Sequence, residues 1–215
     1  MFGRVTKFNV ASEKTDAAID YGNNTVRPAV LALGGLGLTM LTDRKSGLGY
    51  AIAWWKDEAA ATGSASEANK IRDAFKQAMN ATVLDIHTYD VAVDVDLHKA
   101  STLAARVTPG EADPARSDEF LTFVKTSIVP KVQAQSGFCR WCSLIDRQTG
   151  KNLSITFWES IAARDADPAI LNQNRDAATQ TFGAKLDATE YYEVSDLGLP
   201  MTAPIQTSQQ PGANP

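Results

Sequence analysis

Two stretches of sequence, 103 positions apart, decide the fold: residues 50–55 read Tyr-Ala-Ile-Ala-Trp-Trp, and residues 153–158 read Leu-Ser-Ile-Thr-Phe-Trp. Alternate side chains of a strand face opposite sides of a sheet. In each stretch one alternate set is bulky and apolar, while the other set ends in a Trp and is otherwise small. Both faces of each strand are therefore expected to be buried.

The two stretches belong to a longer internal repeat of about 90 residues. At an offset of 102, Arg4-Val5-Thr6 aligns with Arg106-Val107-Thr108, and a one-residue insertion shifts the offset to 103 from Asp43 onward. A match of this length with one insertion predicts a tandem duplication. The further aligned pairs are Pro28/Pro130, Val30/Val132, Gly35/Gly137, Asp43/Asp146, Gly47/Gly150, Trp55/Trp158, Asn69/Asn172, Arg72/Arg175 and Tyr89/Tyr192.

Each copy predicts the same order of elements. An alternating run predicts a strand, apolar residues at helical spacing predict a helix that ends near a Gly, and two runs around Asp-Arg-x-x-Gly predict a hairpin. A second helix and a closing strand complete the ferredoxin-like order β-α-β-β-α-β. The expected strands are 3–10, 36–41, 50–55 and 82–95, then 102–108, 138–145, 153–158 and 188–194; the first helices carry Ile19, Val26, Val30 and Leu33, or Leu121, Val124, Ile128 and Val132; the second helices are 66–80 and 169–182.

A four-stranded sheet with both helices on one face leaves its other face uncovered. We therefore predict an α+β fold in which two ferredoxin-like repeats pack sheet to sheet as an intramolecular dimeric α/β barrel, a pseudo-dimer within one chain. The expected division is a first repeat at 1–95, a polar linker at 96–101 that carries a solvated His98, a second repeat at 102–197, and a tail at 198–215. The tail is rich in Pro, Gln, Ser and Gly, which predicts flexibility.

The composition excludes several classes of function. The 215 residues carry a net charge of −4, and the pI is near 5.2, so no nucleic-acid partner is expected, because phosphate binding needs a basic surface. Two Cys and two His predict neither a disulfide framework nor a His-rich metal site. The N-terminus has no signal-peptide pattern, and the longest uncharged run, 28–42, is too short to span a bilayer. We therefore expect a cytoplasmic protein that does not enter a membrane.

A set of short motifs resembles one known family. They are a Val-x-x-x-x-Gly at the end of the first helix, the Asp-Arg-x-x-Gly turn, the run Phe157-Trp158-Glu159-Ser160, the run Ala166-Asp167-Pro168 and an Arg in the helix that follows. Together they are similar to the antibiotic biosynthesis monooxygenase-like (ABM) domains of the dimeric α/β-barrel superfamily. The resemblance covers about residues 3–93 and 103–195, and it is weaker in the first copy, which keeps Trp55 but continues Lys56-Asp57.

The resemblance implies a cofactor-independent oxygenase that holds an aromatic substrate between sheet and helices. Family oxygenases line this cavity with a Trp and an Arg; the Trp would position rings and the Arg would stabilise a developing oxyanion, while a Tyr or His would move protons. The candidate catalytic residues are therefore Arg175, Arg72, His87 and Tyr50, and the candidate substrate-binding residues are Trp158, Trp55, Asn172, Asn69 and Ser154.

Each candidate also has a structural interpretation. A Trp at the end of a strand can pack in the core, a single His on a strand can be a packed residue, and the Arg of the repeated Asn-x-x-Arg can pair with the adjacent Asp73 or Asp176. Cys139 and Cys142 lie three apart on a predicted strand, so we expect them to face opposite sides of the sheet and to form no paired thiol site.

Two functions remain open. The first is oxidation of a phenol- or quinone-like small molecule. The second is a non-catalytic small-molecule-binding or stress-associated barrel protein, and it is favoured by departures from the oxygenase pattern: Ala51 and Ser154 replace an Asn, and Ala61 and Arg164 replace a Tyr. Haem degradation is disfavoured because Ala74 and Ala177 stand where the haem-ligating His is expected. Only the second copy carries the fuller motif, which favours a first copy that serves mainly to close the barrel; a further homodimer stays open.

Overall fold

The computed structural model describes residues 1–97 and 102–198, called here the first and second half. The expectations for His98 and for the tail beyond Gly198 lie outside these residues. Within the two described ranges no helix has the length and apolar character needed to cross a membrane.

The two halves contain the expected elements in the expected order. Short helices α3 and α7 and the two-residue strand β8 were not expected from the sequence. The first half contains β1 (Phe2–Asn9), α1 (Thr15–Tyr21), α2 (Arg27–Ala32), β2 (Gly37–Thr42), β3 (Leu48–Trp55), α3 (Glu58–Gly63), α4 (Ala65–Met79) and β4 (Thr82–Asp96). The second half contains β5 (Ala104–Glu111), α5 (Ser117–Phe123), α6 (Val129–Gln133), β6 (Phe138–Ile145), β7 (Lys151–Trp158), α7 (Ile161–Asp165), α8 (Pro168–Phe182), β8 (Lys185–Leu186) and β9 (Glu190–Leu197).

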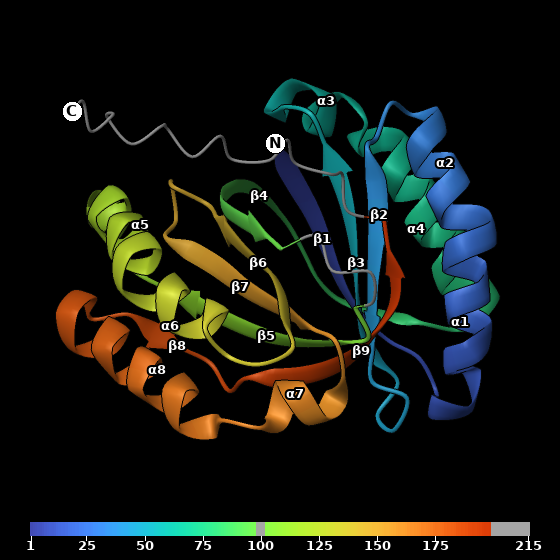
Figure 1. Ribbon diagram of the computed structural model, residues 1–215. Coiled ribbons are helices and arrows are strands. Elements are labelled where there is room, and N and C mark those ends of the chain that lie inside the picture. Colours follow the sequence, from blue (N-terminus) through green and yellow to red (C-terminus); the bar gives the residue numbers. More distant parts are fainter. Residues whose placement is uncertain (98–101, 199–215) are drawn as a thin grey trace, which may run out of the picture.

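Eight of the strands close into one antiparallel barrel (Figure 1). The order around it is β4-β1-β3-β2-β9-β5-β7-β6, and β6 pairs again with β4. The two halves are therefore joined by hydrogen-bonded strands, β4 with β6 and β2 with β9. This is how the barrel expected from the sequence is built: the edge strand of each half extends the sheet of the other.

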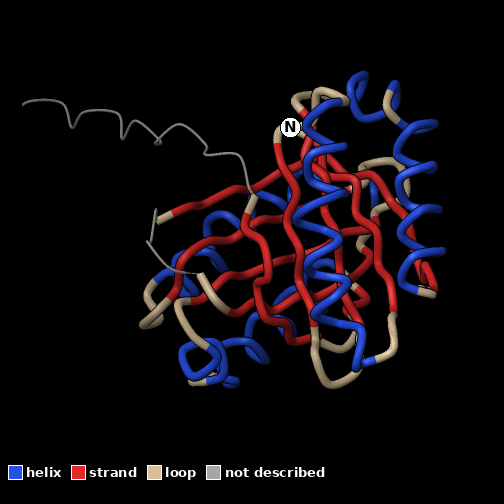
Figure 2. The backbone as a smooth tube through the Cα atoms, turned by 90° about the vertical axis from the view of Figure 1, so that its right-hand side faces the viewer, coloured by secondary structure: helices blue, strands red, loops and turns tan. Residues whose placement is uncertain are grey.

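The alternation along β3 and β7 separates an interior core from two outer faces, as expected. Tyr50, Ile52 and Trp54 of β3 share the interior cluster with alternate residues of β7. On the opposite face of the strands, helices α1, α2 and α4 cover the first half, and α5, α6 and α8 cover the second (Figures 1 and 2). Strands such as β3 and β7 are thus buried on both sides, whereas the N-terminal part of β4 has exposed residues, among them Leu84 and Ile86.

The first helix of each half is interrupted by one π-helical turn, which the sequence did not predict. The turns are Gly22–Val26 and Val124–Ile128, and each is closed by an N–H that reaches back five residues, from Arg27 to Gly22 and from Val129 to Val124. A Pro follows each turn at position 28 or 130. Proline lacks an N–H and its ring clashes with the carbonyl four residues back, so a widened turn accommodates it.

A buried ion pair joins the two halves at the contact between β4 and β6. Arg140 donates to both carboxylate oxygens of Asp94, at 2.8 and 2.6 Å, and its third nitrogen lies 3.1 Å from Asp96. The Arg140 side chain is 6% exposed and that of Asp94 is 10% exposed. Two-point contact with a carboxylate fixes the alignment of the two strands as well as their charge.

We expect Asp94→Asn to lower the free energy of unfolding by about 3 kcal/mol, because it leaves a buried guanidinium without its main counter-charge. Urea denaturation at neutral pH measures this. Asp90→Asn is the control: Asp90 of β4 lies 3.6 Å from Arg147 in the turn after β6, but these side chains are 33% and 46% exposed, and such pairs contribute about 0–1 kcal/mol. Equal losses in the two variants would contradict the role given to Asp94.

Candidate functional site

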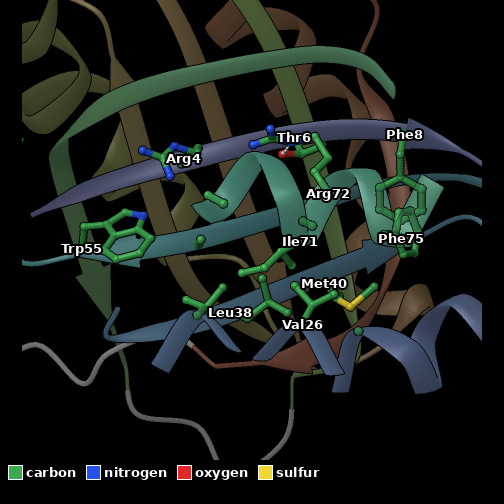
Figure 3. Close-up of a pocket in the computed structure, with 15 residues that line it drawn as sticks. Arg4, Thr6, Phe8, Val26, Leu38, Met40, Trp55, Ile71, Arg72 and Phe75 are labelled. Atoms are coloured by element: carbon green, nitrogen blue, oxygen red, sulfur yellow. Dashed lines mark hydrogen bonds between the residues drawn. The ribbon is translucent and has the colours of Figure 1, made fainter. Parts of the chain in front are cut away.

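Each half holds one cavity between the outer face of its strands and its helices. The N-terminal cavity has a volume of about 70 Å³ and the C-terminal cavity about 80 Å³. A single water needs about 10–15 Å³ of such space, so each has room for several waters or a small ring. The N-terminal cavity (Figure 3) is lined by Arg4, Thr6, Phe8, Gly22, Val26, Val30, Leu38, Met40, Ala51, Ala53, Trp55, Ala68, Ile71, Arg72 and Phe75. The C-terminal cavity is lined by Arg106, Thr108, Phe120, Val124, Ile128, Val132, Gln135, Trp141, Ser143, Asn152, Ser154, Thr156, Leu171, Asn174, Arg175, Ala178 and Leu186.

The π-helical turns form part of both cavity walls. Gly22 and Val26 of the first turn line the N-terminal cavity, and Val124 and Ile128 of the second line the C-terminal cavity. A widened turn displaces the helix backbone from its regular path, and such turns are frequent at functional sites. The same local feature therefore shapes the same wall in both halves.

The strand walls of the two cavities differ in polarity at matching positions. Leu38 pairs with Ala53 in the first half, and Trp141 pairs with Thr156 at the same register in the second. Likewise, Met40 opposite Ala51 corresponds to Ser143 opposite Ser154. The first half presents an apolar wall, whereas the second presents hydroxyl groups and an indole N–H.

The helix walls differ in the same way. Helices α4 and α8 both have 15 residues, and the seventh residue is Ile71 in α4 but Asn174 in α8. The eleventh is Phe75 in α4 but Ala178 in α8. The second half thus has both more polar groups and more room beside its second helix.

Five buried polar atoms that line the C-terminal cavity have no hydrogen-bond partner. They are Nε of Arg106, Nε2 and Oε1 of Gln135, Nε1 of Trp141 and Oδ1 of Asn174. Among the described residues around the N-terminal cavity, only Nε1 of Trp55 is in this state. A buried polar atom without a partner costs about 1–3 kcal/mol, so this cluster marks a place where a polar ligand would stabilise the protein.

Two arginines line each cavity, and among the described residues no Asp or Glu does. The arginine of the second helix is held by its own half: Arg175 donates to the carbonyls of Leu186 and Asp187 at 3.0 and 2.8 Å and to Thr189 at 3.2 Å. Arg72 donates to Asn69 at 2.6 Å and to Thr6 at 3.4 Å. Burial lowers the pKa of Arg72.

The arginines of the first strands differ more sharply. Arg4 donates to the Ser64 hydroxyl at 3.1 Å and to the Ala61 carbonyl. Arg106 stands at the matching position, since Arg4 pairs with Ala53 and Arg106 with Thr156. Its guanidinium lies 4.9 Å from the centre of the Trp158 ring and has no hydrogen bond or ion pair within residues 1–97 and 102–198. Burial lowers the pKa of both strand arginines.

The structure places only some of the predicted site residues at the cavities. Trp55, Arg72, Ser154 and Arg175 line them. Trp158 is fully buried but lies behind the cavity, where it donates to Thr156 at 3.0 Å and packs on Phe138. Asn69 and Asn172 are exposed on the helices and line neither cavity.

Tyr50 and His87 lie on the interior side of the barrel, away from both cavities. The Tyr50 hydroxyl donates to Glu190 at 3.0 Å, and Tyr192 donates to the same oxygen at 2.6 Å. Burial, then the charge of Glu190, raises the pKa of Tyr50. His87 lies 2.9 Å from Asp146. Tyr50 and His87 therefore do not share a site with the candidate Arg and Trp residues, contrary to the sequence-based prediction.

The expectation that Cys139 and Cys142 face opposite sides of the strand is wrong. Both belong to the interior cluster, because the pairing of β6 with β7 is irregular between Phe138 and Arg140 and the alternation shifts by one residue there. Burial raises the pKa of the Cys142 thiol. No group of three His, Cys, Asp or Glu side chains in the described parts of the chain is arranged to hold a metal ion.

Sequence reasoning missed Arg106, Gln135, Trp141 and Asn174. Arg106 was visible as part of the Arg-Val-Thr retained in both copies, but that motif was used only to align them. Asn174 lies two residues from Asn172, and only the observed rotation of α8 shows that it is the inward-facing one. Trp141 and Gln135 belong to no motif that is repeated in the first half.

The fold and the cavities define a class: an antiparallel α+β barrel of ferredoxin-like type with a helix-covered cavity on each half. Three solved structures share the fold. An anthrone oxidase-like protein matches with a TM-score of 0.61 and 15% identity, over 94% of this chain and 96% of that one. A ferredoxin-fold protein related to antibiotic biosynthesis monooxygenases, from Listeria monocytogenes, matches with a TM-score of 0.52 and 12% identity, over 91% of this chain and 96% of that one. A monooxygenase-like protein from Listeria innocua matches with a TM-score of 0.52 and 12% identity, over 90% of this chain and 94% of that one. The expected resemblance to ABM proteins is thus confirmed at the level of fold.

Sequence comparison places the chain beside two uncharacterized proteins of Mycobacterium tuberculosis. One is 25% identical over 193 residues, which are 89% of this chain and 86% of the relative. The other is 24% identical over 197 residues, which are 89% of this chain and 82% of the relative. No family model matches the chain.

The contact of His87 with Asp146 gives a pH-dependent expectation. Burial acts to raise the pKa of Asp146, but hydrogen bonds from Thr149, Gln148 and His87 outweigh it and hold the pKa at about 2. An unfolded Asp has a pKa of about 3.9. The depressed folded value stabilises the protein above about pH 4, and this contribution is lost as the pH falls toward 2.

We therefore expect the unfolding free energy of Asp146→Asn to depend less on pH between about 4 and 2 than that of the original protein, by chemical denaturation at stepped pH. Asp176→Asn, on the exposed side of α8, controls for the loss of a surface carboxylate. A pH dependence that is the same in Asp146→Asn as in the original protein would rule out this linkage.

Proposed function

We propose that this chain is a cofactor-independent, monooxygenase-like enzyme that acts on an oxygen-bearing aromatic small molecule in the C-terminal cavity. The observation that carries the proposal is the set of five unpartnered polar atoms on the wall of that cavity. Phenols and quinones carry the oxygen atoms that such a set would bind. The fold supports the assignment, because the similar structures include an anthrone oxidase-like protein and a monooxygenase-like protein.

The cavity chemistry suits a substrate that reacts in its ionised form. Arg106 and Arg175 place positive charge on the wall, which favours a phenolate over the neutral phenol. Dioxygen then oxidises the electron-rich ring. One oxygen atom becomes the new ring carbonyl, the ring C–H and phenol O–H hydrogens leave with the other as water, and four electrons pass from ring to dioxygen.

The proposal also includes the tandem duplication and its division into repeats at 1–95 and 102–197. It is supported by the strand pairs that recur at the same register 103 residues apart, such as Leu38 with Ala53 and Trp141 with Thr156. On this view the first half closes the barrel, and the second half holds the working site. Whether two chains associate further does not affect the assignment.

The test is oxygen consumption with a panel of anthrones and hydroquinones. We expect the protein to accelerate oxygen uptake, and Ala178→Phe to lower the rate at least tenfold, because a Phe side chain at this helix position would project into the space that the substrate needs. Ala68→Leu is the matched control; it places in the N-terminal cavity the side chain that Leu171 presents in the other, and should change the rate less than twofold. Circular dichroism checks that both variants fold.

One observation favours the second candidate function, non-catalytic binding. No Asp, Glu, His, Cys or Tyr lines the C-terminal cavity, so none of its described side chains can accept a proton at neutral pH. Aerobic and anaerobic incubations that both return unreacted substrate would exclude the oxygenase. Binding that Ala178→Phe abolishes would then identify the protein as a binder.

A further inference from the structure

The C-terminal cavity contains a buried cation, Arg106, that forms no ion pair in the described structure. Arg106 is 5% exposed, and in the described structure its guanidinium lies against the face of Trp158 and makes no hydrogen bond or ion pair. An arginine stays protonated in proteins, and an isolated buried charge is costly unless it is paired. Asp165 and Asp167 both act on its charge, but neither forms an ion pair with it in the described structure, and both oxygens of the Asp165 carboxylate accept from Arg164, at 2.7 and 3.0 Å.

The matching arginine of the first half, Arg4, has hydrogen-bond partners and a structural role. Arg4 is 7% exposed and is held by Ser64 and by the Ala61 carbonyl, at the end of α3. The matching fourth residue of α7 is Arg164, whose own charge lowers the pKa of Arg106. The side-chain partner Ser64 corresponds, 103 positions further on, to Asp167, whose Oδ1 accepts from the backbone N–H groups of Ala169 and Ile170 rather than from Arg106.

The other unpartnered atoms specify more than the charge. Three are N–H donors, from Arg106, Gln135 and Trp141, and two are acceptors, from Gln135 and Asn174. Arg175 stays charged, but its hydrogen bonds go to Leu186, Asp187 and Thr189, so Arg106 is the cation whose N–H groups are left for a ligand. A complementary ligand carries one negative charge with acceptor oxygens and at least one hydroxyl donor.

We propose that the C-terminal cavity binds a hydroxylated aromatic carboxylate, with its carboxylate on Arg106 and its hydroxyl on the amides of Gln135 and Asn174. This deepens the proposed function, on whose cavity it rests. A carboxylate presents two oxygens to the edge of a guanidinium and matches its single charge. The apolar side chains of Phe120, Leu171 and Ala178 on the same wall accept the ring.

The test compares 4-hydroxybenzoate with two near-isosteres, 4-hydroxybenzamide and benzoate, by isothermal titration calorimetry on the full chain. We expect 4-hydroxybenzoate to bind at least tenfold more tightly than the amide, which lacks the charge, and more tightly than benzoate, which lacks the hydroxyl. Arg106→Met should abolish the preference for acid over amide. Asn174→Ile, which installs the first half's residue, should abolish the preference for 4-hydroxybenzoate over benzoate.

Thermal unfolding without ligand separates a ligand-binding arginine from a structural one. We expect Arg106→Met to melt at the same temperature as the original protein or higher, because it removes an unpaired buried charge. Arg4→Met should melt lower, because it leaves Ser64 and the Ala61 carbonyl without their donor, and should keep the preference for acid over amide.

Three outcomes would overturn the proposal: equal affinity for 4-hydroxybenzoate and its amide, an acid preference that survives in Arg106→Met, or binding of inorganic phosphate through Arg106 with no binding of 4-hydroxybenzoate. Its failure is distinguishable from that of the proposed function. If neutral hydroquinones drive oxygen uptake while acids show no preference, only the anion assignment fails. If acids bind through Arg106 and no substrate consumes oxygen, only the oxygenase fails.

Discussion

The pairing of each half's edge strand with the other half is the constraint on which the rest of the structure depends. An unpaired edge exposes a row of N–H and C=O groups, and each half has two such edges, formed by β4 and β2 in the first and by β9 and β6 in the second. Pairing β4 with β6 and β2 with β9 gives each of these edges a hydrogen-bonded partner strand and closes the barrel. Closure also removes the interior face from water, which allows Tyr50, Ile52 and Trp54 to be buried there.

Closure also determines where chemistry can occur. The interior is filled by the aromatic and aliphatic side chains of both halves, so the tyrosines and the Glu190 carboxylate inside it serve packing and hydrogen bonding. The outer face of each half is covered by helices whose first segment carries a π-helical turn, and there the packing leaves room. The site therefore lies between strand and helix within one half, and the barrel supplies the rigid wall.

Much of the fold could be predicted from the sequence because periodicity and turns report backbone structure directly. The hairpins around Gly47 and Gly150 were predictable, since both residues have positive φ and a Cβ there would collide with a carbonyl. The shared interior position of Cys139 and Cys142 was not predictable, because the irregularity in β6 changes which face of the sheet a residue occupies. The site was harder: Trp158 and Trp55 occupy matching positions, yet only one borders a cavity. Arg4 differs from Arg106 in having hydrogen-bond partners that are distant in the sequence, Ser64 and Ala61. The periodicity of a sequence does not indicate such contacts.

The covalent connection of the two halves has a consequence for how such a site can change. In a symmetric assembly of two identical chains every substitution occurs twice, so an uncompensated cation placed in one cavity would also be imposed on the other. Here Arg4 keeps its hydrogen-bond partners, while Arg106 has no hydrogen-bond or ion-pair partner among the described residues and lies against Trp158; Ile71 stays apolar while Asn174 does not. One cavity can preserve the stability of the barrel while the other gives up stability for recognition. Such a barrel should take up one ligand per chain rather than two.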